Sequence, residues 1–171
     1  MEIRRLGADE ARGHVPALAA VLLDCVDGGA SIGFMDSLTV EEAEEFFRSI
    51  AGAVDSGDRV LLAAFDGPEL VGTTQVILSA LPNGVHRAEI AKVLVHRSAR
   101  RRGVAAALME RAEDEARAEG KTLLVLDAVS DGDAARLYAR LGWTRVGEIP
   151  DFALFPDGRY CSTTYFYKPL A

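Results

Sequence analysis

An arginine-rich turn between a strand-like segment and a helix-like segment is the feature that most constrains the fold of this chain. Residues 88–95 have the composition of a β-strand, and residues 103–118 have the periodicity of a helix that stops at Gly120. Leu123 to Leu126 is an uninterrupted apolar run, which is typical of a strand buried on both faces. Strand, helix and strand in this order make a βαβ unit, so the two strands should lie parallel with a right-handed crossover.

The rest of the chain places further elements on both sides of this unit. Thr39 and Glu42 form a capping box, which predicts the start of a helix. The hydrophobic pattern predicts strands at 2–6, 59–65, 70–78, 143–148 and 162–167, and helices at 9–26, 40–54 and 133–141. With 171 residues, 49% of them hydrophobic, the chain is long enough to form one core. We therefore predict a single domain over residues 1–171 of the α/β (α+β) class, with a mixed, mostly antiparallel sheet of about seven strands, a central parallel βαβ unit and about four helices.

Charge and composition exclude several classes of function. The formal net charge of -7 argues against broad binding of nucleic acid or anionic membranes, because both require basic surfaces. No apolar run approaches the roughly 18 residues of a membrane span, and the first residues lack the apolar region of a secretory signal. We therefore expect a cytoplasmic protein without a nucleic-acid or membrane partner. Cys25 and Cys161 have no partner at metal-ligand or redox spacing, so we expect neither a metal site nor a disulfide framework.

Arg97, Arg100, Arg101 and Arg102 stand out in this acidic chain, and Gly103 follows them at the predicted start of a helix. The first N–H groups of a helix lack internal partners and carry the positive end of its dipole, so a glycine-containing turn there can cradle phosphate oxygens. Arginines beside it would add charge-assisted contacts. The turn lacks the Gly-Lys-Ser/Thr of a Walker loop and the three spaced glycines of a dinucleotide fingerprint. It favours a pyrophosphate ligand other than a nucleoside triphosphate or NAD, and a solvated charge run is the alternative.

Two segments resemble the signatures of the GNAT superfamily of N-acetyltransferases. Val93 to Ala105, with the sequence VLVHRSARRRGVA, resembles the CoA-binding motif, and Leu137 to Trp143 resembles the tyrosine helix that leads to a Gly-Phe/Trp pair. The order of the predicted elements is similar along nearly the whole chain. The resemblance implies acetyl-CoA as cosubstrate, held by Val93, Leu94, Val95, Arg100, Arg101, Arg102, Gly103, Val104, Ala105, Asp131 and Tyr138. Asp131 departs from the pattern, because many members have asparagine at that position.

Further segments resemble those of tabtoxin-resistance acetyltransferases within the superfamily. They are 27–35, 82–84, 87–89, 144–148 and 156–159. This resemblance implies a small amine as acceptor, for example an amino-acid-like antibiotic or toxin such as tabtoxinine-β-lactam. The glycine-rich but apolar segment 28–36 is then expected to cover a small pocket. The candidates for substrate contact are Ser31, Phe34, Met35, Glu89 and Asp127.

Acetyl transfer to an amine requires a neutral nucleophile, a polarised thioester carbonyl and a proton for the departing thiolate. Glu89 and Asp127 lie at opposite ends of two adjacent parallel strands, and each is a candidate general base or substrate ligand. The alternative is a carboxylate satisfied by loop amides or by Arg87. Tyr138 is the candidate general acid at the CoA sulfur, although its spacing alone favours a core tyrosine. The resemblance also implies that backbone N–H groups near Val95 hold the thioester carbonyl.

Three functions are compatible with these residues. The first is a small-molecule N-acetyltransferase, monomer or homodimer, that transfers the acetyl group directly in a ternary complex. The second is a protein or peptide N-acetyltransferase, and the third is a CoA-binding sensor without turnover. The apolar loop at 28–36 favours a small pocket, and the joint presence of Glu89, Asp127 and Tyr138 favours an enzyme.

Overall fold

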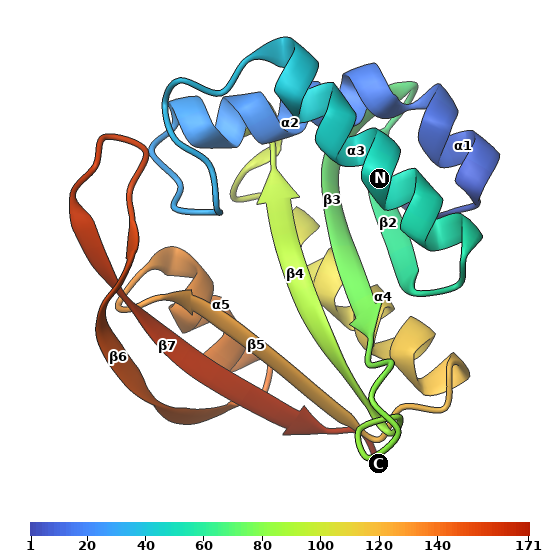
Figure 1. The fold of residues 1–171 in the computed structure, drawn as a ribbon, viewed down its shortest axis with the longest axis vertical. Coiled ribbons are helices and arrows are strands. Elements are labelled where there is room, and N and C mark those ends of the chain that lie inside the picture. The colour runs from blue at the N-terminus through green and yellow to red at the C-terminus, as the bar shows by residue number, and fades with distance from the viewer.

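The computed structural model describes residues 1–171 and shows one mixed sheet with helices on both faces (Figure 1). The strands are β1 (Glu2–Leu6), β2 (Arg59–Asp66), β3 (Glu69–Leu78), β4 (Arg87–Val95), β5 (Leu123–Val129), β6 (Thr144–Leu154) and β7 (Tyr160–Pro169). The helices are α1 (Ala8–Gly13), α2 (Val15–Asp27), α3 (Val40–Asp55), α4 (Val104–Ala118) and α5 (Asp133–Arg140), with a 3₁₀ turn at Arg97–Ala99. The strand order is β1-β2-β3-β4-β5-β7-β6, which confirms the predicted α+β class with a seven-stranded mixed sheet.

β4 and β5 form the parallel pair that the sequence predicts, and every other pairing is antiparallel. The pair is short, because it joins only Arg87–Glu89 to Leu123–Val125. Beyond these residues the two strands diverge, and the sheet opens into two arms (Figure 1). The register of β4 with β3 shifts between Thr73 and Gln75, and Lys92 has a left-handed φ of 54°. A bulge of this kind bends its strand, and here it accompanies the divergence that leaves the facing edges of β4 and β5 unpaired.

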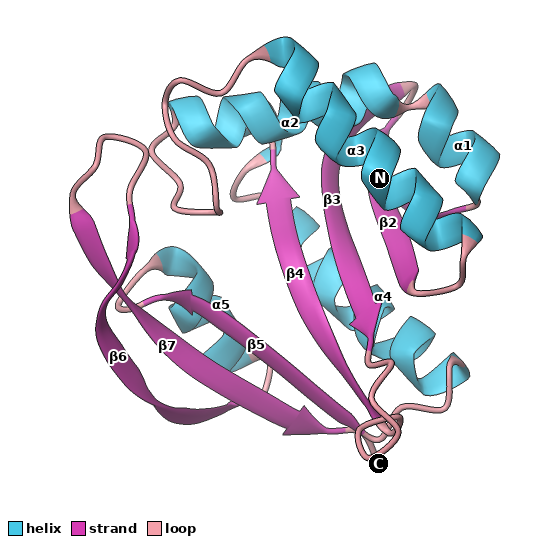
Figure 2. Cartoon of the chain, viewed as in Figure 1, coloured by secondary structure: helices cyan, strands magenta, loops and turns pink.

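Alternation along the strands sorts the apolar side chains into two cores. On one face, residues such as Leu62, Leu124 and Phe166 pack with residues of α4 and α5. On the other face, residues such as Leu61 and Ala63 pack with residues of α1, α2 and α3. Figure 2 shows that these three helices cover the arm formed by β1 to β4, whereas the same face of β5, β6 and β7 carries no helix. The open end between β4 and β5 therefore lies at the border between a covered and a bare part of the sheet.

The predicted helix at 9–26 is two helices, α1 and α2, so the chain has five α-helices and not about four. Pro16 stands in the first turn of α2. Its missing N–H and fixed φ are tolerated at a helix start but not in a helix interior, so the chain breaks at His14. None of the five helices combines the length and the apolar character that a membrane-spanning helix needs.

The strands of the second arm are longer than the sequence predicts. β5 continues to Val129 and β6 to Leu154, beyond the expected ends at Leu126 and Glu148. β6 is an edge strand with mostly exposed residues, and its register with β7 shifts after Ile149. An exposed and bulged edge strand lacks a regular apolar alternation, so its length is not visible in the sequence.

Candidate active site

The N-terminus of α4 is suited to bind an anion. Gly103 is the N-cap residue and has a φ of 80°, a left-handed conformation that glycine adopts without strain. No side chain caps this helix, its first turn has no acidic residue, and a Cβ at Gly103 would meet no atom within 4 Å. The first N–H groups of α4 therefore have no capping side chain, and no acidic side chain in the first turn neutralises the positive end of the helix dipole. These observations fit the phosphate ligand that the sequence predicts for this turn.

The three arginines of the turn differ in what they contact. Arg100 Nε donates to the Val95 carbonyl at 3.1 Å, and Arg102 Nη2 lies 2.7 Å from Asp66 Oδ2. Arg101 is exposed, has a φ of 59° and forms no ion pair with a carboxylate of the chain. The guanidinium of Arg101 is therefore free to bind a phosphate, whereas Arg100 and Arg102 would have to share or exchange their present partners.

The backbone of β4 presents N–H groups at the open strand edge. The N–H of His96 donates to the Val71 carbonyl of β3 at 2.9 Å. Because alternate N–H groups of a strand point to opposite sides, those of Val93 and Val95 point away from β3. They lie along the edge of β4 that is not paired with β5. A thioester carbonyl or an amide carbonyl of the cofactor could accept hydrogen bonds from them there.

Gly72 of β3 lets β4 and the start of α4 approach closely. A Cβ at Gly72 would lie only 3.0 Å from the Leu94 carbonyl oxygen and 3.2 Å from Val104 Cγ1, so a larger residue would push α4 away from the sheet. The side chains of Leu94 and Val104 are buried in the core. These two predicted cofactor residues are therefore available to a ligand only through their backbone, and Ala105 next to them is partly buried.

Asp131 lies in the turn between β5 and α5. It has a φ of 58°, a left-handed conformation that Asp and Asn adopt more readily than most residues. Its carbonyl accepts a hydrogen bond from Arg136 Nη1 at 2.7 Å, and the residue is exposed. The turn geometry explains why aspartate is tolerated in place of asparagine, and the contact of Asp131 with CoA stays a prediction.

Glu89 and Asp127 share one face of the sheet at the point where β4 and β5 separate. Glu89 stands opposite Val125, so Asp127 lies one side-chain repeat further along β5 on the same face. The expectation that they lie at opposite ends of their strands is wrong, because β5 continues past Asp127 to Val129. Partial burial raises the pKa of Glu89, and the nearby charge of Asp127 raises it further. Thr163 Oγ1 donates to Asp127 Oδ2 at 2.6 Å and fixes that carboxylate.

Tyr138 belongs to the core, and its surroundings keep its hydroxyl protonated. Its side chain is 5% exposed, and its ring packs against Phe166 at 5.9 Å and Trp143 at 6.2 Å between centroids. Burial raises the pKa of the hydroxyl, and the charge of Asp127 raises it further. The hydroxyl therefore stays protonated at neutral pH, which is the state that a general acid needs.

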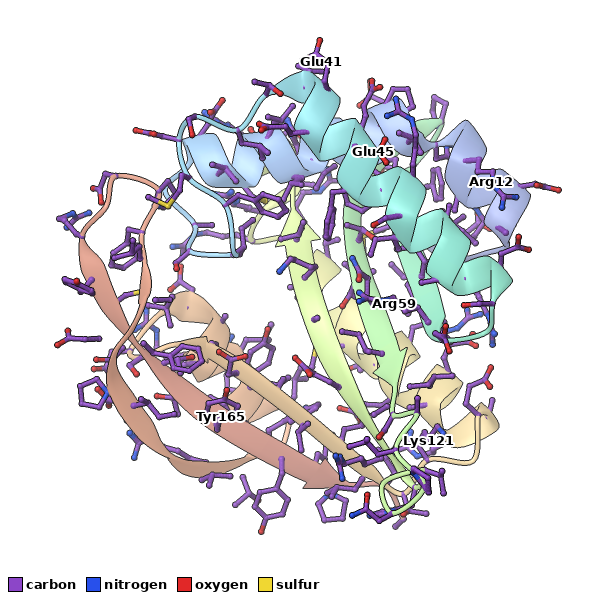
Figure 3. All side chains as sticks on the ribbon, in the orientation of Figure 1. Arg12, Glu41, Glu45, Arg59, Lys121 and Tyr165 are labelled. Atoms are coloured by element: carbon purple, nitrogen blue, oxygen red, sulfur yellow. The ribbon has the colours of Figure 1, made fainter.

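Arg59, Gln75 and Lys92 lie on the same face as the two carboxylates and were not identified from the sequence. Arg59 Nη1 donates to Gln75 Oε1, and the charges of Arg59 and Lys92 both lower the pKa of Glu89 against the effect of burial. Figure 3 shows Arg59 over β2 and Tyr165 over β7 on the same side of the sheet. Gln75 and Lys92 could have been identified as polar residues in the interior of predicted strands. Arg59 gives no such signal, because it stands at the start of β2.

The loop between α2 and α3 packs on the β6–β7 hairpin. Ser31 Oγ donates to the Leu154 carbonyl at 2.6 Å, so this predicted substrate residue uses its hydroxyl to hold the loop in place. The ring centroid of Phe34 lies 5.9 Å from Lys92 Nζ, and burial lowers the pKa of that amine. Met35 is exposed at a surface hollow beside α3. Of the three predicted loop residues, Phe34 is thus the one that the structure places beside the charged face.

Comparisons with known proteins point to one family. Residues 31–143, more than half of the chain, match the model of the acetyltransferase (GNAT) family. Solved structures with the same fold include a ribosomal-protein-alanine N-acetyltransferase from Brucella melitensis, with a TM-score of 0.82 and 20% identity over 99% of this chain and 100% of that one.

Two further solved structures are similar over nearly their whole length. The candidate acetyltransferase yncA from Salmonella typhimurium, solved with acetyl-CoA, has a TM-score of 0.82 and 21% identity over 100% of this chain and 94% of that one. A candidate phosphinothricin N-acetyltransferase has a TM-score of 0.80 and 18% identity over 99% of this chain and 98% of that one. At these identities the structural likeness shows a common fold.

Proposed function

The chain belongs to the acetyltransferase (GNAT) family, which uses acetyl-CoA, and we propose that it transfers the acetyl group to the amine of a small, amino-acid-like molecule. The observation that carries this proposal is the Glu89–Asp127 pair on the open face between β4 and β5. The pair shares β4 with the free N–H groups of Val93 and Val95, so an amine held by the carboxylates would lie along the same strand edge as the thioester.

Acetyl-CoA supplies an activated acyl group in the form of a thioester. The first N–H groups of α4 would hold its diphosphate, with Arg101 as the free guanidinium beside them. The N–H of Val95 would hold the thioester carbonyl, because it points to the unpaired edge of β4. A backbone donor fixed in a strand needs no reorganisation during the reaction, which favours catalysis.

The acceptor amine is protonated at neutral pH and has to lose a proton before it can attack. We assign this proton to Glu89, because its raised pKa makes its carboxylate a stronger base than an ordinary glutamate. Asp127, fixed by the hydroxyl of Thr163, would hold the ammonium group before the proton moves. Tyr138 would donate its proton to the departing sulfur.

We assign the acceptor to amino-acid-like antibiotics or toxins such as tabtoxinine-β-lactam. Segments 27–35 and 156–159 resemble those of tabtoxin-resistance acetyltransferases, and a candidate phosphinothricin N-acetyltransferase has the same fold. The loop between α2 and α3 is tied to the β6–β7 hairpin through Ser31, and Asp36 N–H donates to the Pro156 carbonyl at 3.2 Å. A loop held to the hairpin in this way favours a small molecule over a peptide chain.

The test is thiol release from acetyl-CoA in the presence of a panel of amines. The panel contains tabtoxinine-β-lactam, phosphinothricin, free amino acids, polyamines and short peptides with free N-termini. We expect turnover with at least one amino-acid-like compound and none with peptides. Turnover with peptides alone would assign the chain to protein N-acetylation, and tight CoA binding without turnover of any amine would assign it to sensing.

A further inference from the structure

Four charged side chains on the open face lack an ion-pair partner. Arg59, Glu89, Lys92 and Asp127 form no pair within 4.0 Å, whereas most arginines of the chain hold a carboxylate within that distance. The four are nevertheless near one another, because the charges of Arg59 and Asp127 act on both Glu89 and Lys92. Positive and negative side chains that lie close together without forming ion pairs can each bind a group of opposite charge on one zwitterionic ligand.

The strand register places a cation and an anion in one row. Arg59 of β2 stands opposite Ile77 of β3, and Ile77 stands opposite Glu89 of β4. Arg59 and Glu89 therefore lie on one face, two strands apart, which corresponds to about 10 Å between their Cα atoms. Their long side chains flank Ile77 from both sides. A small molecule with its ammonium group toward Glu89 and an anionic group toward Arg59 would match this row.

Gln75 fixes the orientation of the Arg59 guanidinium. Its side chain is fully buried, and its Oε1 accepts from Arg59 Nη1. Its Nε2 has no hydrogen-bond partner, although an unpaired buried donor costs about 1–3 kcal/mol. The neighbours of Gln75 in register are Leu61 and Ala91, so an apolar side chain would serve a purely structural position better. A glutamine at this buried position is explained if its role is to orient the guanidinium of Arg59. The remaining N–H groups of Arg59 have no acceptor within the protein and are left for a ligand.

Lys92 adds a second positive charge to this part of the face. Its left-handed backbone conformation accompanies the bulge in β4. Its Nζ lies 5.9 Å from the ring centroid of Phe34, and a Cβ at Gly33 would lie 3.5 Å from it. The amine therefore sits under the loop between α2 and α3, where a bound acceptor would be covered.

We propose that Arg59, oriented by Gln75 and assisted by Lys92, binds a carboxylate of the acceptor while Glu89 and Asp127 bind its amine. A guanidinium binds a carboxylate through two parallel hydrogen bonds, which fixes the orientation of the ligand as well as its position. The inference rests on the proposed function and narrows it, because the substrate is then a zwitterionic amino acid and not a simple amine or a polyamine.

The first experiment compares acceptors that differ only in the carboxylate. L-glutamate and phosphinothricin are each assayed as the free amino acid, as the α-amide and as the amine without the α-carboxylate. We expect wild-type kcat/KM to be about 100-fold higher or more for the free acid, because a site built for a charged partner rejects analogues that leave it unpaired. In Arg59→Gln this preference should fall below about tenfold, because kcat/KM for the free acid should drop much more than kcat/KM for the amide. Equal wild-type activity toward acid and amide overturns the proposal.

Two further variants separate recognition from folding. Gln75→Leu should raise the KM for the free acid about tenfold and leave kcat unchanged, because the guanidinium remains but is no longer oriented. Arg48→Gln is the matched control, since Arg48 is an exposed arginine of α3 that pairs with Glu44 and should leave the preference intact. Equal losses toward acid and amide in Arg59→Gln, with a normal melting temperature, also overturn the proposal.

Binding without turnover distinguishes this proposal from the proposed function. Calorimetry measures the affinity of CoA-bound protein for L-glutamate, for phosphinothricin and for their amides. If no amine is acetylated but a free acid binds about 100-fold more weakly to Arg59→Gln than to wild type, the carboxylate site stands and the proposed reaction fails. If amines are acetylated while Arg59→Gln leaves the affinity for the acids unchanged, the reaction stands and the carboxylate site is wrong.

Discussion

Glu89 and Asp127 lie one side-chain repeat apart on the same face of the sheet, across a parallel strand pair that ends beside them. Burial raises the pKa of Glu89, and the nearby charge of Asp127 raises it further. Asp127 instead accepts a hydrogen bond from Thr163 Oγ1, which holds its carboxylate in place. The proposed division between Glu89 as base and Asp127 as amine ligand follows from these different surroundings.

Glu89→Gln should lower kcat/KM by about 10²–10⁴-fold and leave the affinity for acetyl-CoA unchanged. In the wild type, the rate should fall as the pH drops through the raised pKa of Glu89, because the protonated carboxyl group cannot accept a proton. The variant should lack this acidic limb in a profile of kcat/KM against pH. Asp127→Asn is the matched comparison and should mainly raise the KM for the amine. If Asp127→Asn alone removes the acidic limb, the two roles are exchanged.

The same Glu89→Gln substitution should stabilise the fold at neutral pH. Folded Glu89 has a raised pKa, so its favourable contribution is fully present below the pKa of the unfolded chain and is lost as the pH rises through the folded pKa. Glutamine has no charge to desolvate. We therefore expect a higher melting temperature than wild type at about pH 8 and a difference close to zero at about pH 3.5. A difference that is the same at both pH values would contradict a partly desolvated charge at Glu89.

Local signals made the parallel unit, the turn before α4 and the strand positions of both carboxylates predictable. Gly103 stands at a helix start, and Glu89 and Asp127 belong to strands with strong apolar patterns, so each can be placed from its immediate neighbours. Arg59 and Gln75 could not be placed in this way. Their site depends on the register of β2, β3 and β4, which non-local pairing determines, and a lone arginine at a strand start resembles any solvated charge.

The divergence of β4 and β5 was also beyond the sequence. It accompanies the bulge of β4 at Lys92. A left-handed position is usually occupied by glycine or asparagine, so a lysine gives no signal of it in the sequence. The contact of the Ser31 hydroxyl with the Leu154 carbonyl could not be predicted either, because the two residues are far apart in the sequence. Tertiary contacts decide both features.

Arg101→Gln should weaken the binding of acetyl-CoA about tenfold, because Arg101 is the arginine of the turn without an ion-pair partner. The loss should shrink as salt is added, since an exposed charge–charge contact is screened. Calorimetry at low and high salt measures both effects. Arg145→Gln, which removes an exposed arginine of β6 that pairs with Glu148, is the control. An equal loss of affinity for pantetheine, which has no diphosphate, would show that Arg101 does not act on the phosphates.

Tyr138→Phe should fold normally, because the phenylalanine ring fills the same site between Trp143 and Phe166. The raised pKa keeps the hydroxyl protonated, so the basic limb of the wild-type pH profile should not arise from Tyr138 below about pH 10. The same shift makes the hydroxyl a weaker acid, and its proton should move only as the sulfur gains charge.

Loss of the Tyr138 hydroxyl should therefore slow the reaction on the order of 10²-fold in kcat without abolishing it, since water or bulk acid can still protonate a thiolate. CoA affinity should change little. The measurements are kcat/KM of wild type and Tyr138→Phe across pH, CoA binding by calorimetry and the melting temperature. A well-folded variant with normal turnover would leave Tyr138 as a core residue only. Selective loss of CoA binding would instead make its hydroxyl a ligand contact, because an acid that acts only on the leaving sulfur contributes nothing to the ground-state complex.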